Sequence, residues 1–181
     1  MIKVGISGKI AAGKSEVEKI LLDMNYPVYD LDNISHNLLN DNEQIKVQIL
    51  DEFNTLDRKE LANIVFNDEL KKQKLENIIY PELKKEVFNI FEKHKKDKFV
   101  FISGALLFKS GFYKLFDKTI YVEAEEKIRL ERLMKRNNLL KETALARLNL
   151  QDDGNCADII IENNYDVSDL RKEIIKLIAQ I

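Results

Sequence analysis

The sequence is poor in the residues that build disulfide frameworks and Cys/His metal centres. It holds one cysteine, Cys156, and two histidines. A single cysteine cannot form an intrachain disulfide, and the few candidate ligands do not make a Cys/His metal cluster. No run of about 18 apolar residues is present, and the N-terminal residues lack the pattern of a signal peptide. We therefore expect a cytoplasmic protein that does not bind membranes.

Proline and an excess of either charge are also scarce. Only two prolines, Pro27 and Pro81, occur in 181 residues, and we find no internal repeat or low-complexity segment. The 29 basic side chains nearly balance the 31 acidic ones, which argues against a nucleic-acid polymer as partner. The length and the 45% hydrophobic content fit one α/β domain with a small insertion. A monomer is expected, with weak oligomerisation left open.

One phosphate-binding motif is clearly present. Residues 8–15, Gly-Lys-Ile-Ala-Ala-Gly-Lys-Ser, fit the P-loop pattern G-x-x-x-x-G-K-[ST]. An apolar, β-branched stretch at 2–6 precedes the motif, and residues 17–24 follow it with one apolar helical face. Strand, loop and helix are the context that the motif requires. The alternative is a chance match in a glycine-containing turn, and average residue usage makes that about one per cent or less.

The motif predicts a nucleoside triphosphate site. Backbone N–H groups of such a loop form an anion nest above a helix N-terminus. Gly8 and Gly13 would allow the close approach, Lys14 would reach the β- and γ-phosphates, and the Ser15 hydroxyl would ligate Mg²⁺. Mg²⁺ is therefore the expected cofactor. The predicted ATP-binding residues are Gly8, Ala11, Ala12, Gly13, Lys14, Ser15 and Glu16.

Two carboxylates, Asp30 and Asp32, follow the second predicted strand at 26–29. Residues i and i+2 of a strand point the same way, and the ends of parallel strands face the ligand crevice. A carboxylate at that place can orient an acceptor hydroxyl and take its proton in phosphoryl transfer. Alternatively, Asp32 is the N-cap of a helix over 33–39, and both roles can hold. His36 is interpreted as a surface or packing residue.

The segment 43–95 is helical in pattern, and we expect Pro81 to break or kink it. It is too long for one crossover between strands, which predicts a helical insertion that either covers a second substrate or is purely structural. The next predicted strand, 99–102, ends at Ser103, where many P-loop proteins carry an acidic residue that serves the Mg²⁺ shell. A water held by Ser103, or Asp30, is a possible substitute. An aromatic helix is predicted over 112–116.

Basic side chains crowd the end of a predicted helix over 124–136. Arg132 and Arg136 are spaced i, i+4 and share a face, and guanidinium groups suit phosphate oxygens. A solvated basic face at a helix C-terminus explains them equally well. A second helix over 142–150 carries Arg147, and the two helices together predict a mobile lid that excludes water from the γ-phosphate.

Taken together, these segments resemble the dephospho-CoA kinase family over nearly the whole chain. The family's P-loop, its D-A-D and its R-x-x-L-x-x-x-V-F segment are similar to residues 5–15, 30–32 and 58–66. Its later motifs, L-E-x-I-x-H-P, P-L-L-F-E, Q-x-x-R-L-x-x-R, A-x-x-R-x-x-x-Q and A-D-x-V-I-x-N, are similar to residues 75–81, 105–109, 129–136, 144–151 and 157–163. The P-loop alone is shared by many enzymes, whereas the ordered set is far more specific.

The resemblance implies an α/β P-loop NTPase fold with a three-layer core, a parallel sheet of about five strands, a helical CoA-side insertion and a helical lid. It implies the transfer of a phosphoryl group from ATP to the ribose 3′-hydroxyl of dephospho-CoA, the last step of coenzyme A biosynthesis. The implied core comprises 1–32, 98–123 and 157–181, with the insertion at 33–97 and the lid at 124–156. The implied catalytic residues are Lys14, Asp32, Arg132 and Arg136, with Arg147 also binding ATP. The implied acceptor-binding residues are Asp30, Asp32, Arg58, Tyr80 and Pro81.

The sequence also departs from the family pattern. Ser103 and Lys109 stand where the family has acids, and Tyr80 replaces a histidine. Ala11 replaces a loop glycine, which would cost about 1 kcal/mol if that residue has a positive φ. These departures leave two other hypotheses, namely another P-loop nucleotide or nucleoside kinase, and a nucleotide- or CoA-binding module that has lost catalysis. The chain has no N-K-x-D guanine motif, which argues against a GTPase.

Overall fold

The computed structural model describes residues 1–66, 68–148, 154 and 156–181. Backbone contacts divide the chain into two compact units, one of residues 1–29 with 94–181 and one of residues 30–93. Within the described residues, none of the helices combines the length and the apolar composition that a membrane span needs. The elements of the first unit are β1 (Ile2–Gly8), α1 (Lys14–Asp23), β2 (Val28–Asp30, ending at the boundary), β3 (Phe99–Ser103), η1 (Phe112–Leu115), β4 (Lys118–Glu123), α6 (Glu126–Asn137), α7 (Lys141–Leu148), β5 (Ile159–Glu162) and α8 (Val167–Gln180).

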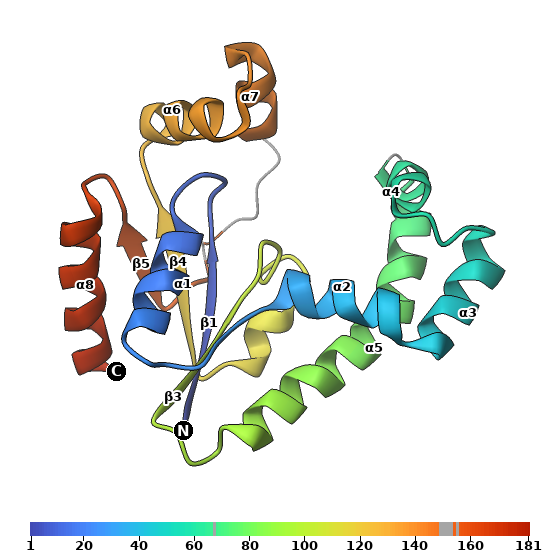
Figure 1. The fold of residues 1–181 in the computed structure, drawn as a ribbon, viewed down its shortest axis with the longest axis horizontal. Helices are drawn as coiled ribbons and strands as arrows, with labels where there is room; N and C mark the ends of the chain where they lie inside the picture. The colour runs from blue at the N-terminus through green and yellow to red at the C-terminus, as the bar shows by residue number, and fades with distance from the viewer. Residues whose placement is uncertain (67, 149–153, 155) are drawn as a thin grey trace. The chain divides into compact units, whose positions relative to one another are not determined.

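A parallel sheet forms the first unit, with the described strands in the order β2-β3-β1-β4-β5. The strands are short, apolar and rich in β-branched residues, as buried parallel strands are. Helices α1 and α8 pack together on one face of the sheet (Figure 1), where Val4 and Ile6 belong to the same buried apolar cluster as Ile20 and Ile174. The expected α/β fold with about five parallel strands is thereby confirmed.

The opposite face of the sheet is covered by the chain that follows β3. A Cβ built on Gly5 would lie 2.9 Å from the side chain of Leu107 and 2.8 Å from that of Phe116. The ring of Phe108 meets Tyr121 edge-on, with centroids 5.8 Å apart. The aromatic helix expected over 112–116 is instead the short 3₁₀ helix η1. Its aromatic side chains are used to cover the sheet, so the segment is shaped by packing rather than by helical periodicity.

The second unit is helical, as the pattern predicted, and holds α2 (Leu31–Asp41), α3 (Glu43–Phe53), α4 (Arg58–Phe66) and α5 (Glu69–Lys93). Its core contains Ile45, Ile49, Phe53 and Leu61. Of the break or kink expected at Pro81, the break is wrong, because α5 is one helix of 25 residues that includes the proline. Buried side chains lie on both sides of the exposed proline, including Ile79 and Leu83, and their packing holds the helix together.

Candidate active site

The P-loop is built by β1, residues 9–13 and α1, as the motif predicted. The loop is closed by two backbone hydrogen bonds of 2.9 Å, from Lys9 N to Val122 O and from Ala12 N to Lys9 O. A Cβ on Gly8 would lie only 2.6 Å from Val122 O, so strand β4 passes too close for any side chain there. Ala11 has a φ of 61°, which confirms that the family's glycine is replaced at a left-handed position.

Two side chains from distant segments brace the end of the loop. Asn163 Nδ2 donates to Ala12 O at 2.7 Å, and Arg132 Nη1 donates to Ala12 O at 3.3 Å and to Asn163 O at 3.1 Å. Asn163 is buried. Gly13 has a φ of 110°, and a Cβ on it would lie 2.1 Å from the Asn163 amide nitrogen. Glycine is therefore required at this position both by backbone conformation and by the neighbouring side chain.

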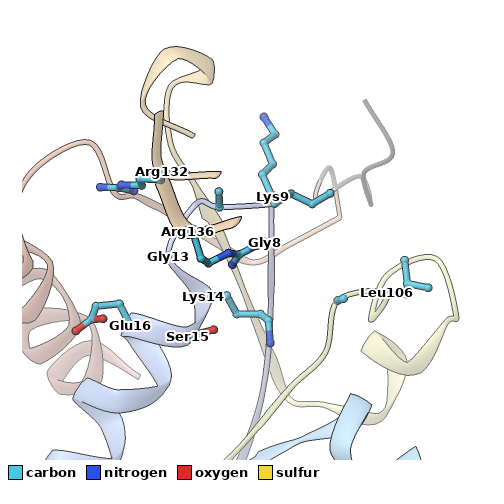
Figure 2. Close-up of a pocket in the computed structure, with 12 residues that line it drawn as sticks. Gly8, Lys9, Gly13, Lys14, Ser15, Glu16, Leu106, Arg132 and Arg136 are labelled. Atoms are coloured by element: carbon cyan, nitrogen blue, oxygen red, sulfur yellow. The ribbon is translucent and has the colours of Figure 1, made fainter. Parts of the chain in front are cut away.

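A cavity of about 390 Å³ opens over the loop. Figure 2 shows Lys14 and Ser15 at the start of α1, with the Lys9 side chain pointing the opposite way from Lys14. Lys9 instead pairs with Glu123 at 3.0 Å. The backbone of the loop, the N-terminus of α1 and the basic side chains make this cavity suited to an anion. It is lined by Gly8, Lys9, Ile10, Ala11, Gly13, Lys14, Ser15, Glu16, Ala105, Leu106, Arg132 and Arg136.

The Lys14 ammonium group has two polar neighbours in the same unit. Its Nζ lies 2.7 Å from Glu18 Oε1 and 3.3 Å from Ser103 Oγ. Ser103 is fully buried at the end of β3, and its hydroxyl also lies 3.4 Å from Tyr29 O. Lysine, carboxylate and serine thus meet beside the cavity, and of the three only the lysine lines it and belongs to the P-loop motif.

Helices α6 and α7 pack on the P-loop as one layer. Leu133 of α6 and Ala144 and Leu148 of α7 form an apolar cluster, against which Ile10 and Ala11 of the loop are packed. This places the two helices of the predicted lid directly on the P-loop. Arg132 and Arg136 of α6 line the cavity, whereas Arg147 is exposed on α7 and is not among the lining residues. Gln151, from the second lid motif, lies outside the described residues.

The arrangement predicted for the two aspartates is partly wrong. Strand β2 ends at Asp30, and Asp32 lies in the first turn of α2 rather than on the strand. Asp30, not Asp32, is the N-cap, because Asp30 Oδ1 accepts the Asp32 backbone N–H at 2.8 Å. Helix capping therefore explains the presence of a carboxylate at Asp30. Asp32 is exposed on the helix and does not cap it.

Within the helical unit, Arg58 has a partner that the sequence pattern did not suggest. Its Nη1 lies 3.5 Å from His36 Nε2, which also lies 3.1 Å from Asn40 Nδ2. Because arginine can only donate, a hydrogen bond between these two side chains requires Nε2 as the acceptor. Nδ1 is buried and has no partner among the described residues. His36 is half-buried and lies at the limit of hydrogen-bond distance from the exposed Arg58, a contact that the surface or packing role expected for it did not include.

Tyr80 lies on α5 of the same helical unit. Burial, together with the charge and hydrogen bond of Glu76, holds the pKa of the Tyr80 hydroxyl above its ordinary value. The hydroxyl therefore stays protonated and remains able to donate. Pro81 follows it and is exposed.

Sequence reasoning missed two of the side chains that contact the P-loop, Glu18 and Asn163. Glu18 carried a signal, since its i, i+4 spacing from Lys14 puts both on one helical face. Asn163 carried a weaker signal. It is the last residue of the final family-like motif, but the sequence suggested no chemical role for an asparagine just after a strand. Its contact with Ala12 joins residues 151 positions apart and depends on the sheet order.

Comparisons with known proteins agree with this site. Residues 2–169 match the family model described as dephospho-CoA kinase. A dephospho-CoA kinase from Oceanobacillus iheyensis is 34% identical over an alignment 190 residues long, gaps included, that covers 94% of this chain and 93% of the relative. A crystal structure from Thermus thermophilus superposes with a TM-score of 0.83 at 30% identity, covering 99% of this chain and 97% of that one. The dephospho-CoA kinase of Campylobacter jejuni gives a TM-score of 0.70 at 29% identity, with coverages of 98% and 96%. The chain therefore belongs to the dephospho-CoA kinase family.

Proposed function

We propose that this chain transfers the γ-phosphoryl group of ATP to the ribose 3′-hydroxyl of dephospho-CoA, with Lys14, Arg132, Arg136 and Asp32 as its catalytic residues. The reaction is that of its family, which matches residues 2–169. The observation that carries the proposal is the P-loop cavity with Lys14 and the two α6 arginines on its wall. We also propose that the enzyme acts as a monomer in the cytoplasm, as its composition led us to expect.

On the donor side, the loop N–H groups and Lys14 bind the phosphates of ATP. The oxygen of Ser15, exposed at the start of α1, fits the preference of Mg²⁺ for oxygen ligands and would hold that ion. Bound Mg²⁺ would neutralise charge on the β- and γ-phosphates. Arg132 and Arg136 stabilise the charge that develops on the transferred group, and Arg147 contacts ATP when the lid helices close.

On the acceptor side, we assign proton removal to Asp32. Its carboxylate would accept the proton of the ribose 3′-hydroxyl as the oxygen attacks phosphorus, and ADP leaves with the β–γ bridging oxygen. Asp30 fixes the start of α2, which holds Asp32 in place. Arg58, Tyr80 and Pro81 of the helical unit would bind the acceptor nucleotide, for which the positive charge of Arg58 is suited.

The proposal is tested by ADP release in the presence of ATP, Mg²⁺ and dephospho-CoA. Wild type is compared with Asp32→Asn and with the control Asp41→Asn, which changes an exposed aspartate at the other end of α2. We expect turnover to depend on dephospho-CoA and to fall by about 10² to 10⁴ in Asp32→Asn, the range for losing a general base. Asp41→Asn should match wild type.

Each other result corrects a specific part of the proposal. Equal turnover in wild type and Asp32→Asn would remove Asp32 as the base and keep the kinase activity. Turnover with another nucleoside and not with dephospho-CoA would favour a different P-loop kinase. Folded wild type that binds ATP and turns over no acceptor would favour the binding module suggested by Ser103 and Lys109.

A further inference from the structure

The Lys14 ammonium group is paired with a carboxylate from its own helix. Glu18 Oε1 lies 2.7 Å from Lys14 Nζ, and the two side chains expose only 16% and 18% of their surface. On a helix, lysine followed by glutamate is the less favourable order for an i, i+4 pair. Helix stability therefore does not explain why a half-buried glutamate pairs with the lysine that we propose to bind phosphate.

The end of β3 does not provide a negative charge beside Lys14. Ser103 is fully buried, its Oγ lies 3.3 Å from Lys14 Nζ, and its hydroxyl is placed to donate to Tyr29 O at 3.4 Å. A serine in this arrangement offers Lys14 a lone pair and no charge. The carboxylate beside Lys14 thus comes from α1 instead of from the strand.

We propose that Glu18 supplies the negative charge that Ser103 lacks, so that it positions Lys14 and completes the anionic surroundings of Mg²⁺ at the phosphate end of the cavity. The inference rests on the proposed function in taking ATP with Mg²⁺ as the ligand. Glu18 is a positioning residue, because it acts through Lys14 and the ion rather than on the reacting atoms.

A carboxylate in this place has opposite effects on two forms of the nucleotide. It repels the phosphates of ATP alone and competes with them for the Lys14 ammonium group. It favours the complex of ATP with Mg²⁺, because the ion adds two positive charges at the phosphates. Glu18 should therefore make nucleotide binding depend on Mg²⁺, which a residue that only supports the fold would not do.

The experiment measures the affinity of a fluorescent ATP analogue, mant-ATP, with Mg²⁺ and with EDTA. It compares wild type with Glu18→Gln, Glu18→Asp and the control Glu43→Gln, which removes an exposed partner that also lies 2.7 Å from its lysine. In Glu18→Gln we expect binding with Mg²⁺ to weaken about tenfold, the effect of one nearby charge, and binding in EDTA to stay equal or tighten. Glu18→Asp should keep the Mg²⁺ preference of wild type, and Glu43→Gln should match wild type.

Two outcomes overturn the inference. Equal weakening with Mg²⁺ and with EDTA would make Glu18 a structural residue, and no change in either would make it inert. If Glu18→Gln does not fold, Glu18→Asp decides. Because that variant keeps the charge, a loss of its Mg²⁺ preference would overturn the inference. Wild type that shows the Mg²⁺ preference and yet phosphorylates no dephospho-CoA would reject the proposed function and leave this inference standing.

Discussion

Replacing Gly13 by alanine tests whether the P-loop conformation is held by tertiary contacts. The backbone at Gly13 has a φ of 110°, and the added Cβ would lie 2.1 Å from Asn163 Nδ2. The backbone strain costs about 1 kcal/mol after allowing for the stiffer unfolded chain. Displacing the buried Asn163 amide from Ala12 O costs about 1 to 3 kcal/mol more. We therefore expect Gly13→Ala to lower the free energy of unfolding by about 2 to 4 kcal/mol.

Urea unfolding of the nucleotide-free protein measures this loss. With a slope of about 2 kcal/mol per molar urea, the midpoint should fall by about 1 to 2 M. Gly111→Ala is the matched control, since Gly111 has a φ of 75° and a Cβ there meets nothing within 4 Å. That variant should lose only the stability that the backbone strain costs, so its urea midpoint should fall by about 0.5 M.

A double-mutant cycle separates the two terms at Gly13. In an Asn163→Ala background the amide is gone, so Gly13→Ala should cost only the backbone term of about 1 kcal/mol. Equal midpoints for Gly13→Ala and Gly111→Ala would refute the reasoning, because the Asn163 contact would then contribute nothing.

Two further predictions concern stability. Ala11→Gly should raise the free energy of unfolding by up to about 1 kcal/mol, and so raise the urea midpoint slightly, because Ala11 has a φ of 61°. A lower midpoint would contradict this. The Thr119 hydroxyl and backbone N–H, 2.7 and 2.8 Å from Asp158 Oδ2, hold the pKa of that carboxyl below its usual range. This stabilisation is present above about pH 4 and is lost as the pH falls through the lowered pKa, so Asp158→Asn should unfold at a lower temperature than wild type at pH 6. The gap should close toward pH 3, and a gap independent of pH would refute this account.

Local residue patterns were enough to predict the strand, loop and helix that form the P-loop. Residues 8–15 carry their own context, since the loop needs a preceding strand, a following helix and glycine at close approaches, all of which are local. The spacing of Arg132 and Arg136 put both on one helical face but left a solvated basic face equally open, and the structure places both on the cavity wall. The resemblance over ordered motifs identified the family from the sequence alone.

Side-chain roles that depend on where a helix begins were less predictable. Asp30 and Asp32 both make good N-caps by type, and only the actual end of β2 decides that Asp30 takes this role. Similarly, Pro81 predicts a break or kink by its local chemistry, yet α5 continues through it, with the buried residues Ile79 and Leu83 on either side. In both places tertiary packing outweighs local preference.

The sequence by itself determined the phosphate-binding loop, the α/β class and the family, because these depend on short-range spacing and on hydrophobic period. Only the tertiary structure decided which distant groups complete the site. Asn163 meets Ala12 through the sheet order, and Ser103 meets Lys14 because β3 lies beside β1. Such contacts arise from the register of parallel strands joined by long crossovers, and no local pattern encodes that register.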